Sequence, residues 1–186
     1  AIDRVANTLV EAVEGVDLVV LAVPVLKTVE IFKTIAPHLT KGTVVTDVGS
    51  TKGSVVEEIS FLVPLGVIFI GGHPMAGSEE QGIKGADSAL LENAIYVLTP
   101  SPNENIAALK KLTDMLRAAG AEPITLEPQV HDHLVAAVSH LPHVAAAALV
   151  NSVSEIEDSE LIRTLAAGGF RDSTRIALGN PGLWRD

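Results

Sequence analysis

The 186-residue sequence contains no cysteine, which excludes a disulfide framework, a thiolate metal site and a cysteine nucleophile and suits a reducing cytoplasm. Basic residues are also few, 13 against 23 acidic ones, and the net charge of −10 argues against nucleic acid or an anionic membrane as partner. The apolar run over residues 144–150 is interrupted too soon to cross a bilayer, and the amino terminus shows no targeting pattern. These absences predict a cytoplasmic protein.

Short apolar runs alternate with helical segments over the first two thirds of the chain. The runs are rich in Val, Ile and Leu and predict strands over residues 17–23, 43–48, 67–71, 94–99 and 123–126. Amphipathic or capped segments predict helices over residues 8–15, 26–36, 52–62, and from an N-cap at Ser101 to near Gly120. This alternation is typical of an α/β fold in which helices cover both faces of a parallel sheet.

The pattern changes after Glu127, beyond which the sequence shows no strand signal. Residues 128 to about 153 predict one long helix, and Pro142 within it predicts a break or a kink because proline lacks the backbone N–H. We therefore predict two domains, an α/β domain over residues 1–126 and the start of an all-helical domain over residues 127–186.

The segment HPMAGSE at residues 73–79 follows one of the predicted strands. A titratable imidazole at the carboxyl end of a strand lies where open α/β sheets bind their ligands. A lone histidine in a turn rich in glycine and proline more often only satisfies nearby backbone groups. Two further polar clusters, at residues 139–143 and 168–175, favour the active-site interpretation of His73.

Three histidines recur along the predicted long helix, His133, His140 and His143. Their spacings of seven and three residues place them on roughly one helical face. A zinc site needs three or four ligands, usually with carboxylate or thiolate groups among them, and the neighbouring side chains supply none. We therefore predict no metal site and interpret the stripe as one wall of a substrate cleft, with a solvated helix face as the alternative.

The third cluster, GGFRDSTR at residues 168–175, combines glycine with arginine. The paired Gly168 and Gly169 are expected to end a helix and to let the backbone approach a ligand. Arg171 and Arg175 are four residues apart, so they share a helical face, and two guanidinium groups suit a dicarboxylate. A surface pair balanced by Asp172 is an equally weighted alternative.

Four segments together resemble the prephenate dehydrogenases of tyrosine biosynthesis. They are DVGSTK at 47–52, HPMAGSE at 73–79, SHLPH at 139–143 and GGFRDSTR at 168–175, in the family's order. The resemblance covers essentially the whole chain and implies a partial Rossmann-type dinucleotide-binding domain over residues 1–126, followed by an incomplete substrate and dimerisation domain. It also implies oxidative decarboxylation of prephenate, or of its amino analogue arogenate, with NAD⁺ or NADP⁺.

The resemblance assigns roles to individual residues. His73 resembles the catalytic histidine that takes the proton of the substrate's ring C4 hydroxyl as hydride leaves C4, and Ser50 resembles the hydroxyl that helps to hold that oxygen. Arg175 resembles the arginine that grips a substrate carboxylate. The expected pocket wall comprises His140, His143 and Arg171.

Further positions match the family's cofactor and subunit contacts. The stretch beneath the cofactor ribose and nicotinamide is expected at Ala22, Val23, Pro24 and Val25, and Ser78 and Glu79 are expected near the nicotinamide end. Trp184 resembles a tryptophan that reaches the site of a neighbouring subunit, which implies a homodimer.

One feature of a Rossmann half is missing from residues 1–186, namely a glycine-rich turn between a first strand and a helix. Gly15 lies between a helix and a strand, where it ends the helix. We therefore expect an internal fragment of a longer enzyme, one that binds NAD⁺ poorly by itself.

Two other classes remain open. A related NAD(P)-dependent 3-hydroxyacid dehydrogenase would share the region around Ala22, but it needs a catalytic lysine in the helical domain, and no lysine follows Glu127. A non-catalytic reading makes the chain a helical assembly fragment. The sequence also does not decide whether the substrate is prephenate or arogenate, or whether the cofactor is NAD or NADP. It leaves open whether tyrosine inhibits the enzyme and whether the parent protein carries a chorismate mutase or regulatory domain.

Overall fold

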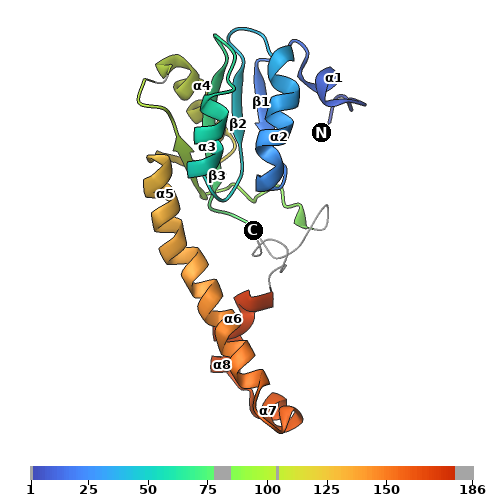
Figure 1. The fold of residues 1–186 in the computed structure, drawn as a ribbon, viewed down its shortest axis with the longest axis vertical. Helices are drawn as coiled ribbons and strands as arrows, with labels where there is room; N and C mark the ends of the chain where they lie inside the picture. The colour runs from blue at the N-terminus through green and yellow to red at the C-terminus, as the bar shows by residue number, and fades with distance from the viewer. Residues whose placement is uncertain (1, 78–84, 104, 179–186) are drawn as a thin grey trace. The chain divides into compact units, whose positions relative to one another are not determined.

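The computed structural model describes residues 2–77, 85–103 and 105–178. These residues divide into two compact units. The first unit holds residues 2–77 and 86–132, and the second holds residues 133–178 together with residue 85. Figure 1 labels the elements of both units.

The first unit is built on a five-stranded sheet with the order β1-β2-β3-β4-β5. The strands are β1 (Leu18–Leu21), β2 (Val44–Asp47), β3 (Ile68–Pro74), β4 (Ile95–Thr99) and β5 (Glu122–Thr125). β1 with β2, β2 with β3, and β4 with β5 pair in parallel, whereas β3 and β4 pair antiparallel, with His73 opposite Val97. The sheet is therefore mixed.

The predicted α/β class is confirmed, but the prediction of a parallel sheet is wrong at β4. A parallel neighbour requires a crossover, usually a helix, whereas antiparallel neighbours do not. The described part of the connection between β3 and β4, residues 75–77 and 85–94, contains turns and no α-helix. An apolar strand of this kind carries no sign of its direction, so composition alone could not reveal the reversal.

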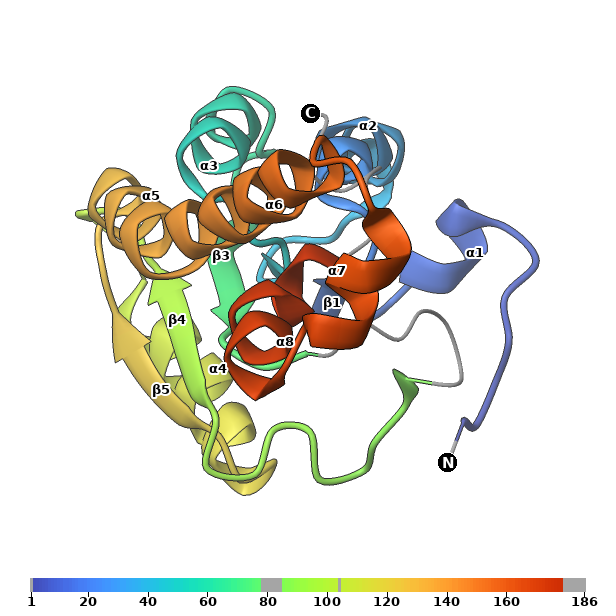
Figure 2. The same ribbon diagram turned by 90° about the horizontal axis from the view of Figure 1, so that it is seen from below.

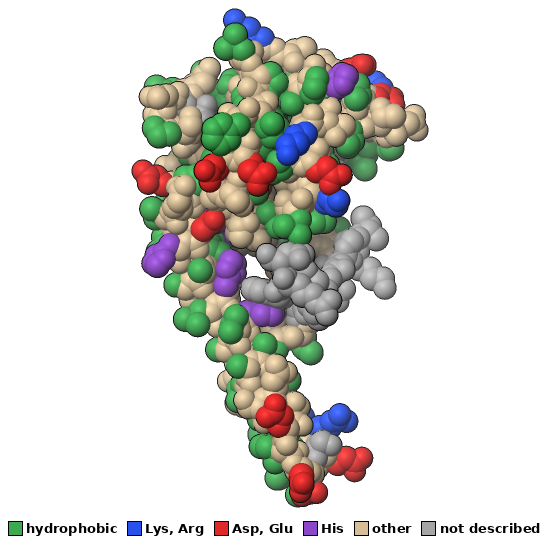
Figure 3. Space-filling view, viewed as in Figure 1, with side chains coloured by type: hydrophobic (Ala, Val, Ile, Leu, Met, Phe, Trp, Pro, Cys, Tyr) green, Lys and Arg blue, Asp and Glu red, His purple; other side chains and the backbone are tan. Residues whose placement is uncertain are grey.

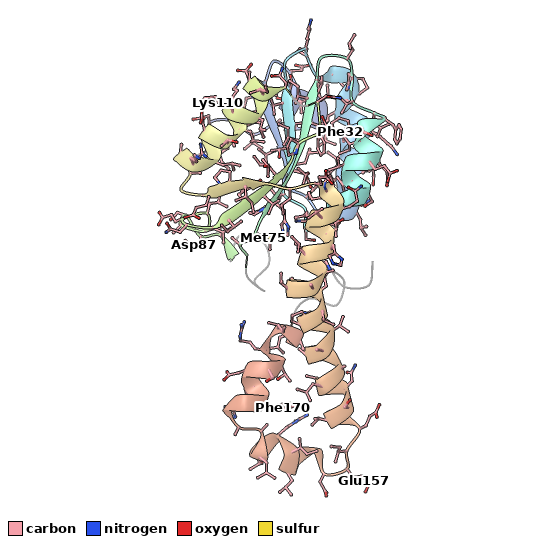
Figure 4. The ribbon with its side chains drawn as sticks, turned by 90° about the vertical axis from the view of Figure 1, so that its left-hand side faces the viewer. Phe32, Met75, Asp87, Lys110, Glu157 and Phe170 are labelled. Atoms are coloured by element: carbon pink, nitrogen blue, oxygen red, sulfur yellow. The ribbon has the colours of Figure 1, made fainter. Side chains whose placement is uncertain are left out.

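Helices cover both faces of this sheet (Figures 1 and 2). One face is covered by α2 (Val25–Ile35) and α3 (Gly53–Ser60), with α1 (Leu9–Val13) beside α2, and the other by α4 (Ile106–Ala118). On the first face Phe32 is fully buried, and its ring meets that of Phe69 edge-on with centroids 5.9 Å apart. On the second face Leu98 and Leu112 are buried. Figure 4 shows Phe32 and Lys110 on opposite sides of the sheet.

Two helix ends in this unit test the predicted caps. The Thr8 hydroxyl accepts the N–H of Glu11, and Gly15 has a φ of 69° after α1, so both ends of that helix are confirmed. The N-cap of α4 is Asn105, whose side chain accepts the N–H groups of residues 107 and 108, so the prediction of Ser101 as N-cap is wrong. Both residue types are favourable N-caps, so sequence alone did not separate them.

The long helix predicted from residue 128 is confirmed as a 27-residue run, Pro128–Ser154. It consists of α5 (Pro128–Val135), a π-helical segment (Ala136–His140) and α6 (Leu141–Ser154). Pro142 lies in the first turn of α6, directly after the π-helical segment, and the helical run continues on both sides of it. The predicted break therefore takes the form of a widened turn within the helix.

The second unit continues with α7 (Ser159–Leu165), α8 (Gly168–Thr174) and a 3-10 turn (Arg175–Leu178). Gly168 and Gly169 begin α8, so the prediction that they end a helix is wrong. The preceding helix already ends at Leu165, with Ala166 as its C-cap, and Ala167 is extended as the N-cap of α8.

Little of the second unit is buried. Among its described residues only Val135 and Ala146 are less than 9% exposed, and Figure 3 shows apolar side chains on the surface of its helices. By length and composition alone the run Pro128–Ser154 could cross a membrane, although such a test is weak evidence for a single helix. An exposed apolar helix equally suits a surface that another protein covers.

Candidate active site

His73 lies in β3, one residue before the strand ends, so its predicted position at the carboxyl end of a strand is confirmed, although the strand runs three residues beyond its predicted end at Gly71. Two glycines allow the backbone of β3 to lie close to atoms of the neighbouring strands β2 and β4. A Cβ atom on Gly72 would lie 2.5 Å from the carbonyl oxygen of Asp47, and one on Gly71 would lie 2.4 Å from the hydroxyl of Thr99. Gly71 and Gly72 thus hold the backbone of β3 against β2 and β4 and place His73 at the end of the strand (Figure 4 labels Met75, two residues further).

A second histidine, His131 on α5, contacts the ring of His73. The distance from Nδ1 of His73 to Nε2 of His131 is 2.8 Å, and the two rings meet edge-on with centroids 5.0 Å apart. The other nitrogen of His131, Nδ1, lies 2.7 Å from Oδ1 of Asp132. His131 is fully buried, so both of its ring nitrogens are used inside the protein.

Asp132 ends this chain of contacts at the first turn of α3. Its two carboxylate oxygens accept the backbone N–H groups of Lys52 and Gly53, at 2.7 and 2.8 Å. Partial burial raises the pKa of Asp132, but these N–H donors and the His131 ring outweigh burial, and the net pKa is lower than the ordinary value. Asp132 is therefore an anion at neutral pH, fixed at the amino end of a helix.

A buried ion pair stabilises the same region, between the turn after β2 and the end of β3. The ammonium of Lys52 contacts the carboxylate of Asp47, and both side chains are 0% exposed. The Asp47 carboxylate also accepts the N–H groups of Gly49, at 2.9 Å, and Gly72, at 3.0 Å. Burial lowers the pKa of Lys52, against the opposing effect of Asp47, and burial together with Asp47 raises the pKa of Tyr96 to about 12. Asp47 thus ties the turn after β2 to the strand that carries His73.

The structure brings several predicted site residues to one edge of the sheet. Ser50 is exposed in the turn after β2, and residues 22–25 lead from β1 into α2. Because β1, β2 and β3 run in parallel, their carboxyl ends share this edge. A Cβ atom on Gly49 would lie 3.1 Å from a methyl group of Val25, so these two turns pack together. The individual roles of Ser50 and of Ala22, Val23, Pro24 and Val25 stay predictions.

The predicted substrate-binding residues lie in the second unit. His140 ends the π-helical segment and His143 lies in the first turn of α6, both partly exposed, and Arg171 on α8 and Arg175 in the 3-10 turn are exposed. Because α6 packs against α8 and against the 3-10 turn, these four residues belong to neighbouring elements. Three other predicted site residues, Ser78, Glu79 and Trp184, lie outside the described residues.

Sequence reasoning missed His131, Asp132 and the buried Lys52. His131 is two residues from His133, which places it about 200° around the helix and off the stripe that the spacing singled out. The available signal was the adjacent pair His131-Asp132 in the first turns of a helix. Within residues 2–77, 85–103 and 105–178 no group of three or more histidine and acidic side chains could hold a metal ion.

Comparisons with known proteins match the whole chain. Residues 1–125 match the family model "Prephenate dehydrogenase, nucleotide-binding domain", and residues 127–186 match "Prephenate dehydrogenase, dimerization domain". Prephenate dehydrogenase from Bacillus subtilis is 38% identical over 187 residues, which cover 100% of this chain and 50% of that protein. The enzyme from Lactococcus lactis is 42% identical over 179 residues, which cover 95% of this chain and 49% of that protein. The chain thus spans about half the length of these relatives.

Solved structures give the same result. Prephenate dehydrogenase from Aquifex aeolicus matches with a TM-score of 0.88 and 31% identity, covering 100% of this chain and 66% of that one. The A. aeolicus enzyme in complex with hydroxyphenyl propionate and NAD⁺ matches with a TM-score of 0.83 and 35% identity, covering 91% and 59%. Synechocystis arogenate dehydrogenase matches with a TM-score of 0.82 and 36% identity, covering 96% and 64%.

Proposed function

The chain belongs to the prephenate dehydrogenase family, and from this premise we propose that it carries the catalytic centre of an enzyme that converts prephenate to 4-hydroxyphenylpyruvate with NAD⁺ or NADP⁺. The observation that carries the proposal is the chain of contacts from His73 through His131 to Asp132 at the carboxyl edge of the sheet. A buried, fixed support of this kind suits a histidine that must meet a substrate proton in one orientation.

The residues near the sheet edge fit the nicotinamide end of a dinucleotide. Ala22 and Pro24 are uncharged, exposed and directly after β1, where a flat, neutral ring and its ribose can lie against the backbone. The bound cofactor would accept the hydride that leaves C4 of the substrate. The sequence of residues 1–186 contains no G-x-G-x-x-G pattern, the usual binding motif for its pyrophosphate.

His73 takes the proton in this proposal. The hydroxyl on C4 loses its proton to a ring nitrogen of His73 while the hydrogen on C4 departs with its electron pair, so that C4 becomes a carbonyl carbon. The bond from C1 to its carboxylate then breaks and CO₂ leaves. The electron pair of that bond enters the ring, which becomes aromatic as the C4 carbonyl oxygen takes a proton back from His73 and becomes the phenol hydroxyl. The protein therefore has to orient its substrate, and to accept one proton and return it. Ser50, on the same edge, is proposed to hold the hydroxyl.

The second unit is proposed to bind the rest of the substrate and a second subunit. Arg175 is proposed as the carboxylate clamp, with His140, His143 and Arg171 along the wall, because guanidinium groups match carboxylate geometry. The exposed apolar helices and the match to a dimerization domain support a homodimer. Trp184 is proposed to reach the partner's site.

The test of this function is the variant His73→Asn in the full-length enzyme. We expect kcat for prephenate oxidation to fall by about 10²- to 10⁴-fold, the usual contribution of a general base, while KM changes little. The control is His38→Asn, since His38 is an exposed histidine in the 3-10 turn Ala36–His38 of the same unit. Near-normal turnover of His73→Asn at neutral pH would exclude the role.

Arogenate is the second candidate substrate, because a Synechocystis arogenate dehydrogenase is among the similar structures. The two substrates differ only at the side chain, which carries a keto group in prephenate and an ammonium group in arogenate. Measuring kcat/KM for both with the same enzyme decides between them. A ratio above about tenfold in either direction, about 1.4 kcal/mol of transition-state binding, would assign the substrate.

A further inference from the structure

We propose that His131 and Asp132 are positioning residues that set the tautomer of His73 and so make its Nε2 the nitrogen that accepts the substrate proton. The inference rests on the proposed function for its catalytic consequence. The tautomer itself is a property of the folded protein that can be measured without substrate.

Asp132 fixes the first donor of the chain of contacts, because an ionised carboxylate can only accept hydrogen bonds. Its oxygens already accept the backbone N–H groups of Lys52 and Gly53. The nearby ammonium of Lys52, although paired with Asp47, adds a further attraction for the negative charge. The atom of His131 that faces Oδ1 of Asp132 at 2.7 Å, Nδ1, must therefore be the donor.

In a neutral imidazole ring, one nitrogen donates a hydrogen bond and the other accepts one. If Nδ1 of His131 carries the hydrogen, its Nε2 carries the lone pair. That Nε2 lies 2.8 Å from Nδ1 of His73, so Nδ1 of His73 is the donor. The neutral ring of His73 then carries its own lone pair on Nε2.

The opposite tautomers are disfavoured by burial. With the hydrogen on Nε2 of His131, its Nδ1 lone pair would face the Asp132 carboxylate. With the hydrogen of His73 on Nε2 instead, its Nδ1 lone pair would face the lone pair on Nε2 of His131. His131 is fully buried, so water cannot relieve either arrangement. The order of donors and acceptors is thus set from one end, by a carboxylate fixed at the start of α3.

The sharpest variant is Asp132→Asn, which keeps the size of the side chain and removes the accept-only carboxylate. An amide must turn its NH₂ group either towards the Gly53 N–H, or towards both the Lys52 N–H and Nδ1 of His131. Each orientation sets donors against a backbone N–H, and the second also reverses the hydrogen bond to His131, so the direction is no longer imposed. We expect kcat to fall by about 10²-fold with KM within about twofold, since a wrong histidine tautomer costs up to about 10⁴-fold where the carboxylate contacts the base directly.

A pair of changes at His131 separates hydrogen bonding from packing. His131→Gln can place an amide oxygen where Nε2 was and keep an acceptor for Nδ1 of His73, so we expect kcat within about tenfold of the unchanged enzyme. His131→Phe fills the space without an acceptor, and we expect it to lose at least as much activity as Asp132→Asn. His38→Gln, on the exposed surface, is the matched control.

The direct readout is the ¹⁵N NMR spectrum of histidine-labelled protein without ligands, with His73→Asn used to assign the signal. We expect His73 as the Nδ1–H tautomer in the unchanged protein and a shift towards Nε2–H in Asp132→Asn. An Nε2–H tautomer in the unchanged protein overturns the proposal, as does folded Asp132→Asn with kcat within about twofold of normal. If His131→Phe does not fold, Asp132→Asn and His131→Gln decide the outcome.

These measurements also separate the two proposals. If the unchanged enzyme does not oxidise prephenate, the proposed function fails. The NMR result for Asp132→Asn still tests whether the carboxylate sets the tautomer of His73.

Discussion

The two units treat their apolar side chains in opposite ways. In the first unit, both faces of the sheet are covered by helices, and buried side chains such as Phe32 and Leu98 are wholly enclosed. In the second unit, large apolar side chains such as Leu141 (64% exposed) and Leu161 (61% exposed) lie on the surface. The first unit therefore carries its own core, whereas the second exposes most of its large apolar side chains, which fits its match to a dimerization domain.

Removing one buried side chain should show this difference most strongly. Phe32→Ala removes a ring that is 0% exposed and should lower the free energy of unfolding by about 3–5 kcal/mol through lost burial and a new cavity. Leu161→Ala, on α7, should change it by less than about 0.5 kcal/mol in the monomer. Urea unfolding at low protein concentration measures both.

Protein concentration sharpens the comparison. If a second copy covers Leu161, the loss from Leu161→Ala grows as the protein concentration rises, because assembly stabilises the folded state by mass action. A loss from Phe32→Ala no larger than that from the exposed Phe61→Ala would contradict the assignment of the core.

The two units also differ in the space around their glycines, as Gly72 and Gly169 show. A Cβ atom on Gly72 would lie 2.5 Å from backbone oxygen, whereas one on Gly169 meets nothing within 4 Å among its neighbours. Gly72→Ala should therefore cost about 1–3 kcal/mol of stability, and Gly169→Ala should leave stability unchanged or raise it by up to about 1 kcal/mol, because alanine is the better helix former. Thermal unfolding distinguishes the two outcomes. A destabilising Gly169→Ala would mean that another surface packs against α8.

Arg175→Lys tests the role proposed for the second unit. Lysine keeps the charge but loses the planar fork of donors, so KM for prephenate should rise about tenfold while KM for the cofactor stays within about twofold. Steady-state kinetics with each substrate varied in turn gives both values. If only the cofactor KM rises, or neither rises, the clamp must be reassigned, with Arg171 as the first candidate.

The smallest effect concerns acid stability. The folded-state pKa of Asp132 is lowered, so its carboxylate stabilises the protein at pH values above its ordinary pKa, near 4, and this contribution is lost as the pH falls through the folded-state pKa. The difference in unfolding free energy between the unchanged protein and Asp132→Asn should therefore be constant from about pH 7 to 5 and shrink below that. Urea unfolding at several pH values measures it. A difference that grows in acid would contradict the assignment.

The sequence predicted the fold class because strand and helix periodicities are local properties. The five strands and the helix from Pro128 are confirmed. The predictions of the direction of β4 and of the N-cap of α4 were wrong. In both cases the sequence allows more than one local structure, and tertiary packing decides which one forms.

The candidate site was only partly predictable. His73 was found because it belongs to a recognisable segment. Its partner His131 lies 58 residues away in the sequence. Hydrophobic periodicity reports only local structure, so it could not predict a contact between residues so far apart. Lys52 was predicted as the first residue of an amphipathic helix, and it is the N-cap of α3, with its side chain buried against Asp47. Lysine is rarely buried without a charged partner, and only the fold supplied that partner.

The position of Asp132 has a consequence for how the polypeptide can be divided. The first family model ends at residue 125 and the predicted domain boundary lies at 126, yet the compact first unit extends to residue 132. A protein cut at residue 126 would retain the whole sheet and His73, but it would lose His131 and the carboxylate that holds the start of α3. An isolated nucleotide-binding half should therefore end after residue 132, within α5. Chimaeras between relatives should be joined at the same place.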